Sequence, residues 1–243
     1  KIRLEDAAGR TILDFSYQDD WRSVADGKGF SLTIIDPTNP DPGSWDQKDA
    51  WRASAYTGGS PGQDDSGMLP NPGTVVINEV LVHSHADDSD WIELYNTTGT
   101  SINVGGWFLS DSQDNLAKYQ IPEGTTMGPF TYLVFRQDWH FGNANAPGCY
   151  EPFALSENGD EVYLSSARSG TLTGYREAEA FDASATGTSL GRYYKAATDS
   201  YNFVAMEQNT PAFTNAGPKV GPIVINEIMY HPDWPVGGSY TNE

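Results

Sequence analysis

Residues 74–96, TVVINEVLVHSHADDSDWIELYN, carry the clearest pattern in the chain and decide its fold class. The first half of this stretch is almost wholly apolar, interrupted only by Asn78 and Glu79, which predicts a buried β-strand. Residues 91–95 then alternate in a period of two, as a half-buried strand does. A loop of residues 83–90, which contains Asp87, Asp88 and Asp90, joins these two strands. The stretch therefore predicts a pair of neighbouring strands.

A shortened copy of this stretch, IVINEIMYHPDW, occupies residues 223–234. Ile77-Asn78-Glu79 corresponds to Ile225-Asn226-Glu227, an offset of 148 residues (225 − 77), and His83 corresponds to His231 at the same offset. This match indicates an internal repeat.

The N-terminal residues align with the second half of the same repeat. Phe30-Ser31-Leu32 matches Thr188-Ser189-Leu190, and Ser60-Pro61-Gly62 matches Thr210-Pro211-Ala212. The domain boundaries predicted from this are residues 1–66 for the C-terminal part of one module and a linker, 73–218 for a complete module, and 222–243 for the beginning of the next. Because the chain begins without Met and stops within a repeat, we expect it to be a piece of a longer protein.

Composition favours an all-β protein. The 25 Gly and 15 Pro residues indicate many turns, and short runs rich in Val, Ile, Tyr, Phe and Thr lie between them. About eight or nine short strands in the central module predict an antiparallel β-sandwich. Gly105-Gly106 predicts a bulge or bend within a strand, Asn158-Gly159-Asp160 predicts a hairpin turn, and residues 58–73 are typical of a linker.

Charge and apolar content exclude several classes of function. The formal net charge is −19, with 14 Lys and Arg against 33 Asp and Glu, and such a surface repels nucleic-acid phosphate. We therefore expect no nucleic-acid partner. No apolar run is long enough to span a membrane, and the single cysteine, Cys149, excludes an intramolecular disulfide.

Several blocks of the central module occur in the order known from one family. They are VINEV at 76–80, DWIELYN at 90–96, VGGWFLSD at 104–111, YQIPEGT at 119–125 and FALSENGDEVYL at 153–164. In these blocks the module resembles a lamin tail domain. The resemblance implies immunoglobulin-like antiparallel β-sandwich modules in tandem, of the kind found in large secreted or cell-surface bacterial proteins. It implies no catalytic residues, and it leaves the partner open.

The loop between the first two strands is a candidate metal site. His83 and His85 with Asp87 follow the His-x-His-x-Asp spacing of binuclear zinc hydrolases, and the carboxylates Asp87, Asp88 and Asp90 are the ligand type that calcium prefers. The chain has only four histidines, and the hydrolase pattern requires histidine at the position of Asp88. The alternative is a solvated polar turn. The acidic loop at residues 111–115 has the same two interpretations.

Two further features carry candidate chemistry. Glu79 and Glu93 are expected on neighbouring strands, where a carboxylate pair either performs acid–base chemistry or accepts hydrogen bonds from a backbone turn. Among the tryptophans, Trp45 and Trp139 are expected in loops as exposed side chains.

From these features we expect a non-catalytic structural, adhesion or protein-interaction module of a secreted or surface protein. Its expected partner is a protein or an extracellular glycan. The alternatives are a carbohydrate-binding module and a metal-dependent hydrolase that uses His83 and His85. The end strand, residues 223–230, is expected to pair with residues 1–57 of the same or a second chain, because an unpaired apolar strand seeks a sheet edge.

Overall fold

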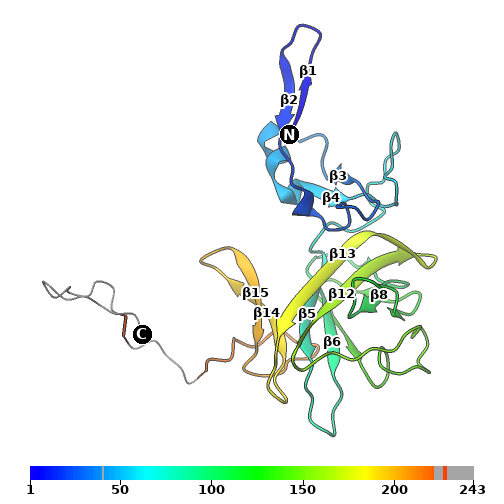
Figure 1. The fold of residues 1–243 in the computed structure, drawn as a ribbon, viewed down its shortest axis with the longest axis vertical. Coiled ribbons are helices and arrows are strands. Elements are labelled where there is room, and N and C mark those ends of the chain that lie inside the picture. The colour runs from blue at the N-terminus through cyan, green and yellow to red at the C-terminus, as the bar shows by residue number, and fades with distance from the viewer. Residues whose placement is uncertain (40, 222–226, 229–243) are drawn as a thin grey trace, which may run out of the picture.

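The computed structural model describes residues 1–39, 41–221 and 227–228, and these residues form an all-β structure (Figure 1). The N-terminal part contains β1 (Ile2–Glu5), β2 (Thr11–Phe15), β3 (Leu32–Ile34) and β4 (Trp51–Ala53), with short 3-10 turns η1 (Asp19–Trp21), η2 (Pro42–Asp46) and η3 (Lys48–Ala50). The described residues include no helix with the length and apolar character that crossing a membrane requires.

The rest of the described chain forms a sandwich of two antiparallel sheets. Its strands are β5 (Val75–Leu81), β6 (Trp91–Asn96), β7 (Ile102–Asn103), β8 (Phe108–Ser110), β9 (Tyr119–Gln120), β10 (Thr126–Met127), β11 (Tyr132–Arg136), β12 (Gly159–Arg168), β13 (Thr171–Asp182), β14 (Leu190–Lys195) and β15 (Ser200–Ala205). One sheet has the order β11-β6-β5-β14-β15, the other has the order β13-β12-β8-β9, and β10 and β7 form a separate two-stranded pair. The antiparallel β-sandwich predicted from the sequence is confirmed.

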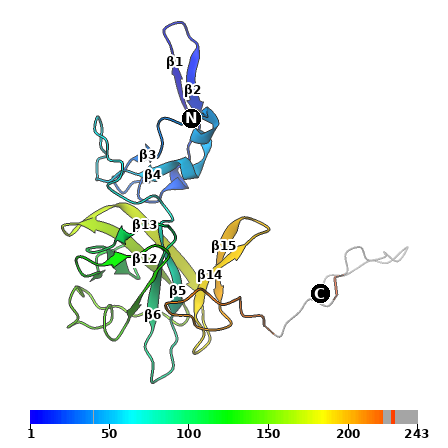
Figure 2. The same cartoon turned by 180° about the vertical axis from the view of Figure 1, so that it is seen from behind.

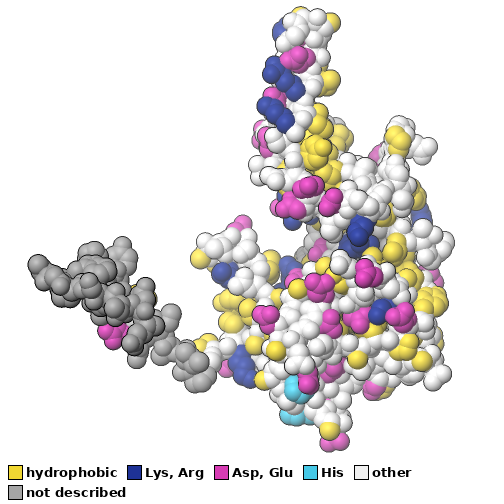
Figure 3. Space-filling view, viewed as in Figure 1, with side chains coloured by type: hydrophobic (Ala, Val, Ile, Leu, Met, Phe, Trp, Pro, Cys, Tyr) yellow, Lys and Arg dark blue, Asp and Glu magenta, His cyan; other side chains and the backbone are white. Residues whose placement is uncertain are grey.

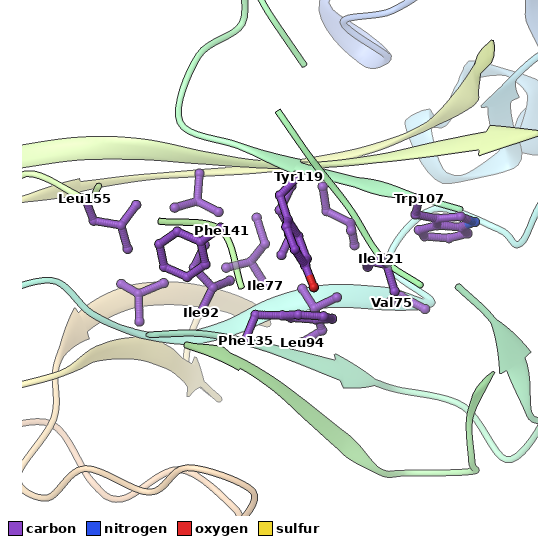
Figure 4. Close-up of a cluster of buried hydrophobic side chains, with 14 of the residues drawn as sticks. Val75, Ile77, Ile92, Leu94, Trp107, Tyr119, Ile121, Phe135, Phe141 and Leu155 are labelled. Atoms are coloured by element: carbon purple, nitrogen blue, oxygen red, sulfur yellow. The ribbon is translucent and has the colours of Figure 1, made fainter. Parts of the chain in front are cut away.

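The core lies between these two sheets (Figure 4). Ile77 of β5 and Ile92 and Leu94 of β6 are fully buried and face Tyr119 and Leu164 of the opposite sheet. Each fully buried side chain of this size contributes about 1.5–3 kcal/mol through loss of apolar contact with water. The alternation of residues 91–95 therefore correctly predicts that Ile92 and Leu94 lie on one face of the strand, which is the face toward the core.

The second face of β6 differs from the sequence prediction. A half-buried strand would leave Glu93 in contact with water, yet Glu93 is 0% exposed; Trp91, expected to be buried as a tryptophan within a strand, is 2% exposed. Glu93 is covered by residues 209–215, more than a hundred positions later in the chain. Both faces of the strand are therefore buried.

Two predicted turns take other roles. Residues 153–155 form no strand, so Asn158-Gly159 leads into β12 and is not a hairpin turn. The hairpin turn is Ser169-Gly170, whose φ angles of 50° and 77° suit the two-residue turn that joins β12 to β13. Gly105-Gly106 separates β7 from β8, which belong to different sheets, so it is a crossing between sheets and not a bulge.

The N-terminal strands pack above β13 and form a separate unit, from which the β1–β2 hairpin extends (Figures 1 and 2). Phe15, Trp45 and Trp51 form an aromatic cluster with ring centroids 5.4–5.7 Å apart. Trp45 is therefore half-buried, and its prediction as an exposed aromatic is wrong. The N-terminal unit meets the sandwich where Gly174 of β13 lies against the carbonyl of Ser54.

The segment predicted to be a linker, residues 58–73, is partly packed into the N-terminal unit. Asp65 is 4% exposed and forms a buried ion pair with Arg52, and it also accepts a hydrogen bond from the Ala55 amide (2.8 Å). A buried carboxylate with these partners holds the segment in place. The expected pairing of residues 223–230 with residues 1–57 falls mostly outside the described residues, and the tandem arrangement of modules stays a prediction.

Candidate functional site

Two glutamates lie side by side on the outer face of the five-stranded sheet. Glu79 of β5 and Glu93 of β6 are paired across the two strands, and both are 0% exposed. A register shift between Ile77 and Glu79, at Asn78, lets Ile77 and Val80 both face the core while Glu79 points outward. The expected adjacency of the two carboxylates is thus present.

The Glu79 carboxylate is held by hydroxyl and amide donors. Its Oε1 accepts from Ser189 Oγ at 2.5 Å and from the Thr210 amide at 3.1 Å, and its Oε2 accepts from Thr210 Oγ1 at 2.6 Å. Ser189 immediately precedes β14, which pairs with β5, whereas Thr210 belongs to the covering segment 209–215. The carboxylate therefore ties this segment to the sheet.

The Glu93 carboxylate makes a second set of bonds to the same segment. Its Oε1 accepts from Asn78 Nδ2 at 2.8 Å, and its Oε2 accepts from the Ala212 amide at 2.5 Å. Ala212 has a φ of 69°, a left-handed conformation that is uncommon outside glycine, and its amide is thereby available to the carboxylate. Asn78 Nδ2 also donates to Asn215 Oδ1 at 2.6 Å, which closes the network.

Burial without a cation shifts the pKa of Glu93. In the described part of the chain, neither Glu79 nor Glu93 forms an ion pair. The pKa of Glu93 is raised from 4.5 to about 7, chiefly by burial and also by the neighbouring Glu79, against the opposing effect of the Ala212 and Asn78 hydrogen bonds. A carboxyl with a pKa near neutrality is suited to proton transfer, but here no solvent reaches it.

The loop between β5 and β6 lies at the end of the sandwich where histidine side chains gather (Figure 3). His83 Nε2 lies 3.1 Å from Glu157 Oε2, and its Nδ1 lies 3.2 Å from the Ser184 carbonyl. The His85 ring packs against Gly187, where an added Cβ would lie 2.4 Å from its Nε2. The two imidazoles therefore have different neighbours.

The loop carboxylates also have separate partners. Asp88 Oδ1 lies 3.1 Å from Arg136 Nη1, Asp90 Oδ1 accepts from the Ser84 amide at 2.9 Å, and Asp87 is exposed. Among the described residues, no three His, Cys, Asp or Glu side chains converge as a metal-ligand set. Metal binding by His83, His85, Asp87, Asp88 and Asp90 stays a prediction, and the observed contacts favour the polar turn.

The second acidic loop already holds a cation of the chain itself. Lys118 Nζ lies 2.8 Å from Asp111 Oδ1 and 3.1 Å from Glu151 Oε1. The ammonium group is mostly buried, so it neutralises these carboxylates where the sequence suggested calcium.

The Lamin Tail Domain family model matches residues 69–178. These residues form a lamin tail domain. The match runs from just before β5 into β13, whereas β14, β15 and segment 209–215 follow it and complete the five-stranded sheet. A search of curated proteins returned no match.

The donors around the glutamates were not recognised as a site from the sequence. Ser189, Thr210, Ala212 and Asn215 lie beyond the matched part of the lamin tail domain, in a polar Pro- and Gly-containing stretch that resembles an ordinary loop. One signal was present, because Ser60-Pro61-Gly62 repeats Thr210-Pro211-Ala212. This match predicts that these positions belong to a repeated unit.

Proposed function

We propose that this lamin tail domain is a non-catalytic structural and protein-interaction module of a larger secreted or surface-attached protein. The observation that carries the proposal is the complete burial of the Glu79 and Glu93 carboxylates. Both carboxylates are 0% exposed, and all four of their oxygens accept hydrogen bonds from the chain itself.

A group with a pKa shifted toward neutrality is ordinarily a candidate for catalysis. A general acid or base must also come within hydrogen-bond reach of the substrate proton that it transfers. Segment 209–215 fills that position over Glu93. The pair therefore serves the module as a clamp that fixes a loop on the sheet.

The acidic surface is consistent with the proposed setting. Acidic side chains are distributed over the face of the molecule in Figure 3, and the net charge of −19 favours solubility and opposes unspecific association. Secretion or surface attachment, with a protein or an extracellular glycan as partner, rests on the family resemblance and is part of the proposal.

The decisive experiment measures turnover of ester, phosphate and glycan substrates by the purified chain. The proposal expects no turnover above the buffer rate. Turnover that is abolished in Glu93→Gln but retained in Glu207→Gln, a matched change at an exposed glutamate, would overturn it.

Carbohydrate binding is a second candidate, favoured by two exposed aromatic rings. Trp139, as expected from its place in a loop, is 67% exposed, and Tyr150 is 68% exposed. Exposed aromatic faces are suited to stacking on sugar rings. Affinity electrophoresis against a set of polysaccharides tests this function. Retardation that Trp139→Ala removes would support it, and equal mobility in every gel would exclude it for those polysaccharides.

A further inference from the structure

One arginine of the sandwich carries a charge that no carboxylate in the described part of the chain neutralises. Arg176 of β13 is half-buried, it forms no ion pair among the described residues, and its Nε is buried without a hydrogen-bond partner. A charge removed from water costs free energy unless an opposite charge compensates it. In a chain with 33 Asp and Glu against 14 Lys and Arg, this arginine therefore requires an explanation other than stability.

The guanidinium keeps its charge in these surroundings. Burial lowers the pKa of Arg176, and the nearby Tyr163 side chain opposes that shift. An arginine with a lowered pKa still holds its proton at neutral pH, because its ordinary pKa is above 12. The position therefore offers a full positive charge that water screens only in part.

A second polar atom without a partner lies directly across the strand pair from Arg176. Ser165 of β12 is the cross-strand partner of Arg176, it is 0% exposed, and its Oγ makes no hydrogen bond within the described chain. Residues paired in this way have their side chains on the same face of the sheet, with Cβ atoms about 4.5–5.5 Å apart. Guanidinium and hydroxyl groups both donate hydrogen bonds. This face therefore has two neighbouring donors for which the chain supplies no acceptor.

Arg176 lines a cavity on the side of the sheet that meets the N-terminal unit (Figure 1). The cavity has a volume of about 620 Å³, which lies within the range of about 300–1,000 Å³ that ligand sites occupy. Arg176 and Lys28 are the cations in its lining, and none of the described residues that line it is a carboxylate. The cavity is therefore positive in a chain whose net charge is −19.

The uncharged part of the lining is of two kinds. Hydroxyl and amide side chains come from Thr57, Gln113 and Thr171, and aromatic rings come from Phe30 and Tyr163. Hydroxyl and amide groups exchange hydrogen bonds with sugar hydroxyls, and an aromatic ring packs against the apolar face of a sugar ring. Cations beside these groups suit a sugar that also carries a carboxylate.

We infer that this cavity binds a carboxylate-bearing sugar, such as a hexuronic acid unit of an acidic glycan, with the carboxylate against Arg176 and Lys28. The planar guanidinium matches a carboxylate in geometry, and hydrogen bonds between charged groups are stronger than those between neutral ones. The bound carboxylate would compensate the charge that the fold leaves unpaired.

This inference rests on the proposed interaction function and deepens it, because it names the chemical class of the partner. A peptide would offer carboxylates too, but peptide recognition ordinarily uses a sheet edge or an apolar groove, whereas this cavity lies on a sheet face and is lined by hydroxyl and amide groups. Trp139 and Tyr150 do not line the cavity, so the two glycan hypotheses can be tested separately.

The test is an NMR titration of the isotope-labelled chain with trigalacturonic acid, and with maltotriose as a neutral control. The Nε–H resonance of Arg176 is assigned by its absence in Arg176→Lys, which keeps the charge. The inference expects this resonance to shift in a saturable way with the acidic trisaccharide and to stay in place with maltotriose.

Three substitutions give the expected order of affinities. Arg176→Met should weaken the binding of trigalacturonic acid at least about tenfold, because the loss of one charged hydrogen-bonding partner has effects of this order. Lys28→Met, at an exposed position, should weaken it about threefold. Arg168→Met removes an exposed arginine outside the cavity and should leave the affinity unchanged. Melting curves establish that each variant is folded, and Lys28→Met with the Arg176 resonance decides the test if Arg176→Met does not fold.

Three results would overturn the inference. These are an Arg176 resonance that trigalacturonic acid does not move, equal affinity in the unaltered protein and in the folded cavity variants, or tighter binding of a hexaglutamate peptide at Arg176, which would assign the cavity to an acidic protein partner. Each would leave the absence of turnover, measured separately, as support for the non-catalytic module. Turnover that depends on Glu93 would instead refute the proposed function and leave the binding result standing.

Discussion

Replacing Glu93 with glutamine tests the buried pair through the pH dependence of stability. The pKa of Glu93 is raised from 4.5 to about 7, so between these values the folded protein holds this proton more tightly than the unfolded chain does. The stability that this group contributes is full below pH 4.5 and is lost as the pH rises through about 7. A shift of this size corresponds to about 3 kcal/mol.

Glutamine cannot ionise, so the variant should lack this loss. It also accepts hydrogen bonds at one atom where Glu93 accepts at two, from Asn78 and from Ala212, and the unsatisfied donor should cost about 1–2 kcal/mol at every pH. At pH 5 the unaltered protein has already lost about 0.8 kcal/mol of this stability, so we expect Glu93→Gln to be less stable there by at most about 1 kcal/mol. At pH 8 the variant should be more stable than the unaltered protein by about 1–2 kcal/mol.

The assay is urea unfolding followed by tryptophan fluorescence at pH 5, 6, 7 and 8, with the free energy of unfolding taken from linear extrapolation. Glu207→Gln removes the same charge from an exposed position, and its stability should run parallel to that of the unaltered protein. If Glu93→Gln also runs parallel across the whole range, the reasoning about its buried carboxyl is refuted.

Three other perturbations test separate parts of the structure. Arg52→Met leaves Asp65 buried without its partner and should destabilise the N-terminal unit by about 3–5 kcal/mol, measured by urea unfolding, with partial recovery on adding Asp65→Asn. Full stability of the single variant would contradict this. Gly174→Ala places a Cβ 2.0 Å from the Ser54 carbonyl and should cost about 1–3 kcal/mol. Hydrogen exchange should then rise in β4 and not in β5; unchanged exchange in β4 would argue against the contact. Calcium or zinc should leave the melting temperature unchanged, because His83, Asp88 and Asp90 already have protein partners; a stabilisation near 2.7 kcal/mol at a hundredfold excess over Kd, lost in His83→Ala, would establish a metal site.

The parts of the fold that follow from local patterning were predictable from sequence. The apolar run around Ile77 and the alternation of Ile92 and Leu94 define β5 and β6, because side-chain direction in a strand follows a period of two. The repeated Asn-Glu pair also indicated that Glu79 has a role beyond solubility.

The cover over Glu93 was not predictable in the same way. Residues 209–215 have no periodicity, and their contact with β6 spans more than a hundred positions, so no local signal connects them. The packed state of Asp65 was missed for a related reason. Its polar, Gly-rich surroundings are typical of a linker, whereas its burial depends on Arg52 in a strand that was also not predicted.

Hydrogen exchange at the amides of Thr210 and Ala212 tests the central claim most directly, because these two N–H groups are the ones that the carboxylates of Glu79 and Glu93 hold. If the buried pair fixes segment 209–215 on the sheet, both amides should exchange as slowly as those of β5. Glu93→Ala should then increase the exchange rate of the Ala212 amide. Exchange of Thr210 and Ala212 at the rate of an exposed loop would contradict the clamp and would open both glutamates to solvent and substrate.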